Sequence, residues 1–431
     1  MKSVSEKESR RNIFFSLGLF QFLTFVRRGV FYTFMINYLY ILMRAVTSTA
    51  MLGTLNMIAS ALGQNLLWGK ISDRYKLRTK LIIIGESIAG FAYLGVFFLH
   101  RSLIDGGNSF AAGLAIIFGL SLLEFFWSMS DVGWATLLTD VTTLQTRGTI
   151  VGILNFVASL GRMVGIIYAG FLYSDGNGFR QGTIFYIVTA MLFTGTAIMW
   201  LTSKSAKETP AVENVQLKGE NRDKKAEDDL EHKNKSVYRW FLISLIIIVL
   251  GAASISQVFL LFLDLKEGLN ASDPEMSLIL TAWTIGGMIA SLLSGKLADK
   301  FGRSKVILFG LFLAVLTPIF YGLSPSVLTM AFVYGVNGIS FWTIQTVGFA
   351  LACDLTPVER KGRLLSRYNT VMALSWGPAG LLIGGPLADF QTGSLGFSTH
   401  AAYINCFLVS SLIVAFGAIV FFLKVMRKTS R

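Results

Sequence analysis

Long apolar segments follow one another along almost the whole chain, and they constrain its fold more than any other feature. A helix that crosses the hydrocarbon core of a bilayer needs about 20 mostly apolar residues, and about twelve such stretches can be counted. They lie near residues 13–42, 48–68, 81–99, 110–138, 149–173, 181–202, 238–263, 275–294, 306–322, 326–352, 365–388 and 400–423. We therefore predict an all-α integral membrane protein with twelve transmembrane helices, which agrees with a composition of 53% hydrophobic and 15% charged residues.

Positive charges are distributed unevenly between the two sides of these predicted helices. The loops on one side contain only Arg44, Arg101, Arg180 and Lys266 out of 38 Lys and Arg residues. Because Lys and Arg concentrate on the cytoplasmic side of membrane proteins, we predict that both termini are cytoplasmic and that the protein lies in the cell membrane. This one-sided distribution explains the net charge of +13 by the orientation of the protein in the membrane. It therefore argues against a nucleic-acid partner.

A polar segment divides the apolar stretches into two sets of six. Residues 203–236 carry charges of both signs and almost no large apolar side chains, which is typical of a solvated linker. We predict an N-terminal six-helix bundle over residues 1–202, a cytoplasmic linker over residues 203–236 and a C-terminal six-helix bundle over residues 237–431.

Two short charged motifs occur once in each predicted bundle, at matching positions. "GKISDRYKLRTK" at 69–80 and "GKLADKFGRSK" at 295–305 each follow the second apolar stretch of their bundle. A second pair of charged loops follows the fourth stretch and comprises Asp140 and Arg147 in the first bundle and Asp354 and Lys361 in the second. Two motifs in register indicate a duplicated, pseudo-symmetric six-helix unit.

The repeated loop resembles the signature loop of the major facilitator superfamily (MFS) of secondary transporters. The residues that carry this resemblance are Gly295, Asp299, Lys300, Gly302, Arg303 and Lys305, and in the first copy Gly69, Asp73, Arg74, Arg78 and Lys80. The first copy departs from the pattern, since Lys76 and Leu77 stand where one glycine is expected. The resemblance implies the MFS fold, in which two bundles rock about a central site by alternating access, and it leaves the solute open.

Independently of the family, the repeated loop suits a role as a conformational latch. An Asp beside Arg and Lys at a helix end can hold a helix N-terminus or an Arg of the other bundle. Such a contact forms only while that face is closed. The alternative is that these charges merely fix the topology, but Lys and Arg would then suffice without the Asp.

Ionisable side chains inside a bilayer are costly, so each one is a candidate functional residue. The clear cases all lie in the first bundle: Arg27, Arg28, Glu86, Glu124, Asp131 and Arg162. Three positive and three negative charges could also form a closed structural network. Asp131 and Glu86 lie nearer the predicted cytoplasmic end, which favours structural or gate roles for them.

Helical spacing separates the arginines into two groups. Arg28 shares a polar stripe with Tyr32, whereas Arg27 points about 100° away, toward a neighbouring helix. Arg162 lies in the middle of its span. Two guanidinium groups at one cavity would bind a carboxylate or phosphate, so Arg28, Tyr32 and Arg162 are candidate substrate-binding residues.

Glu124 is the candidate for proton coupling. It is central in its span, and Trp127 and Asp131 continue its face three and seven residues further on. A medium of low dielectric constant favours the neutral form of a carboxyl group, which is the property that a proton-coupled carrier needs. The alternative is a permanent ion pair with Arg28 or Arg162.

Amide and aromatic side chains replace charges in the second bundle. Gln257, Asn337, Gln345 and Trp376 could bind the uncharged part of a solute, although such residues also hold helices together in lipid. The segment "WGPAGLLIGGP" at 376–386 predicts a helix that bends and packs closely.

No phosphate-binding loop and no catalytic arrangement of His with Ser or Asp is present, so we expect no enzyme. Cys353, Cys406 and the three histidines show no metal-binding spacing, and we expect no cofactor. We expect a monomer whose partners are the bilayer, a small solute and protons.

Two functions remain open, besides a sensor that has lost transport. One is proton-linked transport of a small organic anion, and the alternative is efflux of drugs or other amphiphiles in exchange for protons. Drug antiporters of the resembled family carry G-P-x-x-G-G in the fifth helix, whereas this chain has Arg162 between Gly161 and Met163 in place of the proline.

These two hypotheses predict different ligands for the purified protein. An anion carrier should be stabilised by anionic metabolites, and Arg28→Ala should abolish that effect because the guanidinium is the anion's counter-charge. An efflux carrier should instead be stabilised by lipophilic cationic dyes. A thermal-shift screen with both ligand classes distinguishes them, and stabilisation of the Arg28→Ala variant by the same anions would exclude Arg28 from recognition.

Overall fold

The structure, a computed structural model, describes residues 2–75, 77–142, 147–206, 224–356 and 361–429. All regular secondary structure in these ranges is helical, and eleven helical segments are long and apolar enough to cross a membrane. The remaining predicted span, near residues 48–68, is also helical. Its longest α-helix has only 17 residues because a π-helical segment interrupts it. The prediction of an all-α membrane protein is confirmed.

The chain folds into two compact units. The first comprises Met1–Arg44 and Leu55–Leu217, and the second comprises Ala45–Thr54 and Lys218–Arg431. The short segment Ala45–Thr54 therefore belongs to the second unit, although it lies in the first half of the sequence.

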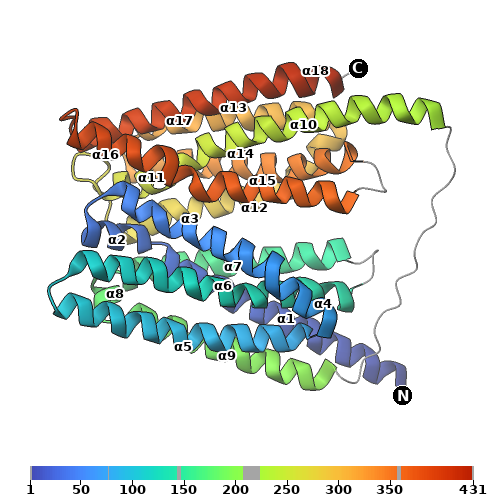
Figure 1. Cartoon of the computed structure of the whole chain (residues 1–431), viewed down its shortest axis with the longest axis horizontal. Helices are drawn as coiled ribbons and strands as arrows, with labels where there is room; N and C mark the ends of the chain where they lie inside the picture. The colour runs from blue at the N-terminus through green and yellow to red at the C-terminus, as the bar shows by residue number, and fades with distance from the viewer. Residues whose placement is uncertain (1, 76, 143–146, 207–223, 357–360, 430–431) are drawn as a thin grey trace. The chain divides into compact units, whose positions relative to one another are not determined.

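The helices follow the chain in the order of the predicted spans (Figure 1). Those that begin in the first half are α1 (Lys2–Tyr32), α2 (Met35–Met43), α3 (Val46–Leu62), η1 (Gly63–Trp68), α4 (Gly69–Tyr75), α5 (Arg78–Asp105), α6 (Ser109–Val141), α7 (Arg147–Leu172), α8 (Asn177–Arg180) and α9 (Thr183–Ala206). Those of the second half are α10 (Lys224–Ser254), α11 (Ser256–Asp264), α12 (Asp273–Phe301), α13 (Arg303–Tyr321), α14 (Val327–Asp354), α15 (Lys361–Ala379), η3 (Gly380–Gly384), α16 (Gly385–Gly393), α17 (Thr399–Phe421), η4 (Phe422–Met426) and α18 (Arg427–Thr429).

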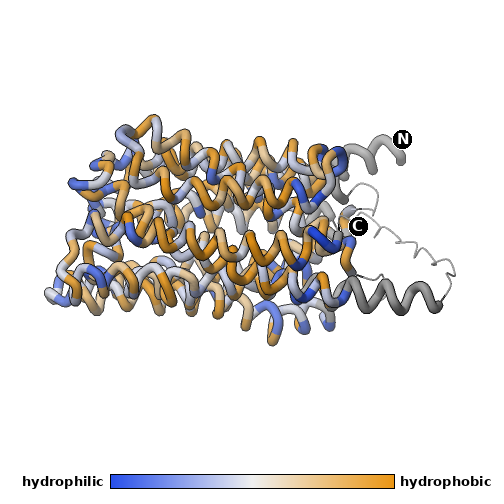
Figure 2. The backbone as a smooth tube through the Cα atoms, turned by 90° about the horizontal axis from the view of Figure 1, so that it is seen from above, coloured by the Kyte–Doolittle hydropathy of each residue, from blue (hydrophilic) through white to orange (hydrophobic). Residues whose placement is uncertain are grey.

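Each unit is held together by side-by-side packing of its long helices. In the first unit α1 packs against α7 and α9, and α5 packs against α6 and α9. In the second unit α14 packs against α12 and α13, and α17 packs against α10 and α13. Hydrophobic residues fill the helix middles and hydrophilic ones gather toward the helix ends (Figure 2). This pattern is what a bilayer requires, because the helix satisfies its own backbone groups where no water is available.

The first predicted span of each half is divided into two helices, although its apolar sequence predicted one continuous helix. The break lies at residues 33–34 between α1 and α2, and at Ile255 between α10 and α11. Hydroxyl groups next to both breaks donate to backbone carbonyls of the preceding turn: Thr33 to Gly29 at 2.5 Å and Ser254 to Gly251 at 2.7 Å. Such back-bonding competes with the helical hydrogen bonds and bends helices.

Helices extend into both ends of the segment 203–236 that was predicted as a linker. Helix α9 ends at Ala206 and α10 begins at Lys224, while residues 207–223 lie outside the described residues. The last part of the predicted 203–236 linker is thus the start of α10. Its sequence, "KKAEDDLEHKNKS", is rich in good helix formers, which explains the extension.

The glycine- and proline-rich segment 376–386 is irregular, in line with its sequence. It contains Pro378 inside α15 and the π-helix η3. A methyl group added at Gly380 would collide with Gln257, and one added at Gly384 would collide with the backbone of Ser254. These two glycines therefore let the helix approach its neighbours at backbone distance.

Close backbone packing also joins α1 to α7. A Cβ atom at Gly165 would collide with the carbonyl oxygen of Val26, and one at Gly29 would lie 2.8 Å from the carbonyl oxygen of Arg162. The two helices touch because these positions carry no side chain.

Replacing Gly165 by Val should therefore destabilise the first unit. Overpacking of this kind costs about 1–3 kcal/mol or more, and we expect a lower melting temperature of the purified protein. Gly152 lies on the same helix with no atom within 4 Å of an added Cβ, so Gly152→Ala should leave the melting temperature unchanged or slightly raised. Equal effects of the two substitutions would contradict the packing assignment.

Candidate functional site

A buried arginine forms the base of the candidate site in the first unit. The Arg27 side chain of α1 is only 2% exposed, and its Nη2 atom lies 3.8 Å from Oε2 of Glu86 on α5, which is equally buried. A buried guanidinium is tolerated only with a counter-charge and further polar contacts. The counter-charge is Glu86, and the further contact is the ring of Trp127, whose centroid lies 4.0 Å from the guanidinium carbon.

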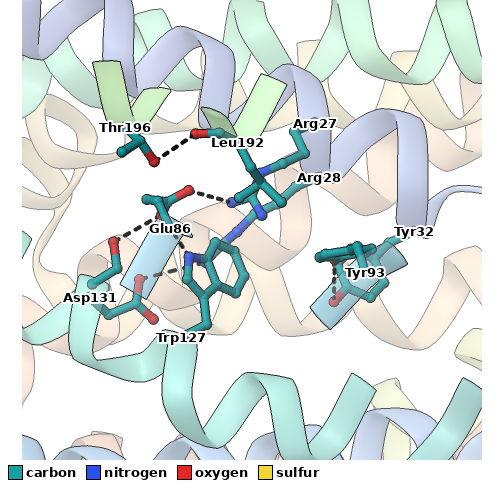
Figure 3. A network of polar contacts seen from close by, with 10 residues as sticks. Arg27, Arg28, Tyr32, Glu86, Tyr93, Trp127, Asp131, Leu192 and Thr196 are labelled. Carbon is teal, nitrogen blue, oxygen red and sulfur yellow. Dashed lines mark hydrogen bonds and ion pairs between the residues drawn. The ribbon is translucent and has the colours of Figure 1, made fainter. Parts of the chain in front are cut away.

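Glu86 is held in place from α6. Its Oε1 atom accepts a hydrogen bond from the indole nitrogen of Trp127 at 2.6 Å and another from the hydroxyl of Ser130 at 2.9 Å. Figure 3 shows this carboxylate beside Arg27 and Trp127, with a dashed line to each. With Oε1 engaged by α6 and Oε2 facing Arg27, both oxygens of Glu86 are used by the protein itself.

The second arginine is paired differently. Nη2 of Arg28 lies 3.6 Å from Oδ1 of Asp131, and these side chains are 35% and 42% exposed (Figure 3). The guanidinium carbon of Arg28 is also 4.6 Å from the centroid of Trp127, which therefore contacts both arginines. Because partly exposed ion pairs are weak, the Arg28–Asp131 pair can open at low cost.

Glu124 adds a third carboxylate to this group. It lies one and two helical turns before Trp127 and Asp131 on α6, is partly buried, and interacts with Arg28 and with the hydroxyl of Ser60. We call Arg27, Arg28, Glu86, Glu124, Trp127 and Asp131 the charged cluster. It holds two guanidinium groups and three carboxyl groups, so it carries one excess negative charge when every member is ionised.

The other predicted site residues of the first unit lie beside or outside this cluster. The hydroxyl of Tyr32 is 3.5 Å from that of Tyr93, and Figure 3 shows both rings beside the charged cluster. Arg162 lies on α7 next to Gly161, which packs against α1, and its side chain is exposed.

The second unit contains an aromatic and amide group. The indole nitrogen of Trp283 donates to Oδ1 of Asn337 at 3.2 Å, and the amide nitrogen of Asn337 donates to Thr317 at 3.0 Å. The ring of Phe341 lies 5.4 Å from Trp283 and 5.0 Å from Trp376. We call these five residues the aromatic group. Its rings are only partly buried. The group therefore presents an apolar surface that a ligand could contact, next to the amide of Asn337, which two hydrogen bonds orient.

Two predicted residues lie apart from those contacts. Gln345 is partly buried on α14, two turns beyond Asn337. The side-chain oxygen of Gln257 accepts a hydrogen bond from Ser256 at 2.9 Å and lies against Gly380. The latter geometry matches the role of a helix-packing amide.

The described contacts of the repeated loops lie inside each unit. In the second copy, Gly302 has φ 90° and forms the single-residue turn between α12 and α13. Arg303 then pairs with Asp354 and donates to the carbonyl oxygen of Ala350. The two repeated motifs of this unit are thus in contact in the folded chain.

The first copy is built differently. Helix α4 ends at Tyr75, Arg78 begins α5, and its Nη1 donates to the carbonyl oxygen of Ser72 at 3.0 Å. Two residues connect the helices where the second copy uses one glycine. Gly69 and Gly295 are helical, and Arg74, Asp299 and Lys300 are exposed. The side chains of Asp73, Asp140, Arg147 and Lys361 lie outside the described residues.

Comparison with known proteins identifies the family. A family model described as Major Facilitator Superfamily matches the chain over residues 17–265 and again over residues 242–431. The chain belongs to this superfamily. It is therefore a multi-pass membrane transporter, and the superfamily does not consist of enzymes.

Several relatives are named for multidrug resistance, and one of them as an efflux pump homolog. Multidrug resistance protein 2 of Bacillus subtilis is 25% identical over 339 residues, which cover 75% of this chain and 76% of that protein. A multi-drug resistance efflux pump homolog of Lactococcus lactis is 23% identical over 365 residues, covering 84% and 82%. An uncharacterized MFS-type transporter of Mycobacterium tuberculosis is 28% identical over 129 residues, and the match spans only 18% of that longer protein.

Solved structures of very different sequence share the fold. A bacterial homolog of the human lysosomal transporter Spinster is 15% identical with a TM-score of 0.71, over 97% of this chain and 98% of the other. A peptide transporter solved with sulfate is 13% identical with a TM-score of 0.69, over 98% and 95%. At these identities the likeness shows the fold alone.

The two arginine pairs predict losses of stability of different size when a carboxylate is removed. Glu86→Gln should lower the stability by about 3–5 kcal/mol, because it leaves Arg27 as a buried unpaired charge. Asp131→Asn should cost about 1 kcal/mol or less, because that pair is partly exposed. Melting temperatures of the purified variants measure the difference.

The double variant Arg27→Met, Glu86→Gln is the control for charge. It removes both members of the buried pair and keeps an oxygen that can accept from Trp127, so it should recover most of the stability lost in Glu86→Gln. Failure to recover would show that the ion pair is not what Glu86 contributes.

Proposed function

We propose that this transporter exports lipophilic, preferably cationic, amphiphiles in exchange for protons. The observation that carries the proposal is the composition of the charged cluster, in which Arg27 faces Glu86, Arg28 faces Asp131 and Glu124 is a third carboxyl group. A group of this kind attracts a proton or a cation rather than an anion. Protons and cationic solutes can then compete for the same charge, as exchange requires.

Glu124 is the proposed exchange residue within the cluster. Glu86 is occupied by Trp127, Ser130 and Arg27, so its protonation would dismantle a buried structure. Asp131 is held by Arg28. Glu124 is the remaining carboxyl group, and its loss or gain of a proton leaves both ion pairs intact.

The aromatic group supports the same solute class. Trp283, Phe341 and Trp376 present partly buried rings, and such rings bind apolar and cationic ligands. Named relatives that align over three quarters or more of this chain include a multidrug resistance protein and an efflux pump homolog. The organic-anion hypothesis depended on free guanidinium groups, and Arg28 is paired with Asp131.

Glu124→Gln should uncouple transport from the pH gradient. In proteoliposomes with an acidic interior, the wild type should accumulate ethidium as protons leave, whereas the Gln variant should not, because its side chain cannot carry a proton. Exchange of labelled ethidium across vesicles without a gradient should weaken as well, because the variant lacks the carboxylate for which the cation competes. The exposed loop residue Glu267 offers a matched control, and Glu267→Gln should behave as wild type. Unchanged pH-driven uptake in Glu124→Gln would remove Glu124 from the mechanism.

A further inference from the structure

One helix of the second unit obtains its N-terminal cap from a residue more than 300 positions away in the sequence. The first N–H groups of an α-helix have no partner within the helix. At the start of α3, the N–H of Val46 donates to Oδ1 of Asp389 at 2.9 Å and the N–H of Thr47 donates to Oδ2 at 2.8 Å. All three residues belong to the second unit. The carboxylate thus accepts two hydrogen bonds and faces the positive end of the helix dipole.

Several other long helices are capped by residues next to their own N-termini. Asn108, Ser326 and Ser398 accept from backbone N–H groups of α6, α14 and α17, and Ser272 with Glu275 forms a capping box on α12. In contrast, α3 follows Ala45, whose side chain has no acceptor. Its N-terminus therefore depends on Asp389, which makes the cap conditional on the position of α16.

The contact continues along one face of α3. A Cβ atom at Gly385 would lie 2.6 Å from the Cα atom of Thr47, so only glycine permits this approach. Two turns further on, the hydroxyl of Thr54 donates to the carbonyl oxygen of Gly377 at 3.0 Å. Residues 47 and 54 share a helix face. Segment Ala45–Thr54 is therefore bound to α15 and α16 at both of its ends.

We propose that Asp389 is a gate residue, which holds segment 45–54 of α3 on α15–α16 and releases it when the gate opens. Opening requires this segment to leave the second unit, and water then replaces the carboxylate at the N–H groups of Val46 and Thr47. Charge-assisted hydrogen bonds weaken as water gains access to them, and these two are partly buried, so hydration of the contact can release both. The gate would act on any solute, and it does not depend on the proposed drug–proton exchange.

Hydrogen–deuterium exchange of the full-length protein in nanodiscs tests the gate. Asp389→Ala should accelerate exchange about tenfold or more across residues 46–54, since both hydrogen bonds are lost. Exchange should also rise across residues 377–389, because the facing surface becomes wet. Asp389→Asn keeps one acceptor oxygen and should give a smaller increase in both segments. Gly385→Ala retains the carboxylate but separates the backbones, and should accelerate both segments as well.

Glu275→Ala is the matched control, because it removes a carboxylate that caps a helix at the same end without bridging to another helix. It should accelerate exchange only in the first turn of α12. If Asp389→Ala behaves in the same way, with faster exchange at residues 46–47 alone and none at residues 377–389, Asp389 is a structural cap and the gate is refuted. The same refutation follows if Gly385→Ala leaves both segments unchanged, and this variant decides the matter should Asp389→Ala fail to fold.

Discussion

The first unit is organised around one costly group, the buried guanidinium of Arg27. A buried charge must have a counter-charge, and other protein groups must replace the water that it has lost. Glu86 supplies the charge, and Trp127 supplies both a ring face for Arg27 and a hydrogen bond that orients Glu86. Three helices, α1, α5 and α6, are thereby fixed in relative rotation. The positions of Arg28, Asp131 and Glu124 follow from that rotation, because they lie on the same helices.

The charged cluster therefore has a rigid part and an adjustable part. The rigid part is the Arg27–Glu86 pair, which is almost fully buried, and the adjustable part is the Arg28–Asp131 pair, with more than a third of each side chain exposed. Trp127 lies against both arginines and separates these roles. A carrier benefits from this division, since a binding surface can change its protonation and pairing only if the helices beneath it stay in place.

Sequence alone predicted much of the fold, because the length of an apolar stretch reports directly on the bilayer. The membrane-spanning helices could be read in this way. The breaks near Thr33 and Ile255 could not, because a serine or threonine bends a helix only in some contexts. The interruption of α3 by η1 is likewise a tertiary effect.

The candidate site was predictable in its members but not in their partners. Spacing placed Glu124, Trp127 and Asp131 on one face of a helix, but it could not show that Trp127 orients Glu86, since these two residues lie 41 positions apart on different helices. Pairing of Arg28 with Asp131 rather than Glu124 depends on side-chain geometry of the same kind. Asp389 went unnoticed because it follows directly after the predicted span 365–388, where an acidic residue is ordinary. The missing local cap before α3, at Ala45, was the one available signal.

In the proposed exchange, a cationic solute and a proton compete for one carboxyl group of the charged cluster. Isothermal titration calorimetry of the purified protein with tetraphenylphosphonium, repeated at one pH in buffers of different ionisation enthalpy, counts the protons exchanged on binding. We expect net release of up to about one proton per bound cation, largest at a pH where the carboxyl group of the unliganded protein is protonated. Binding heats that do not change with the buffer at any pH, or a net uptake of protons, would contradict the proposed exchange.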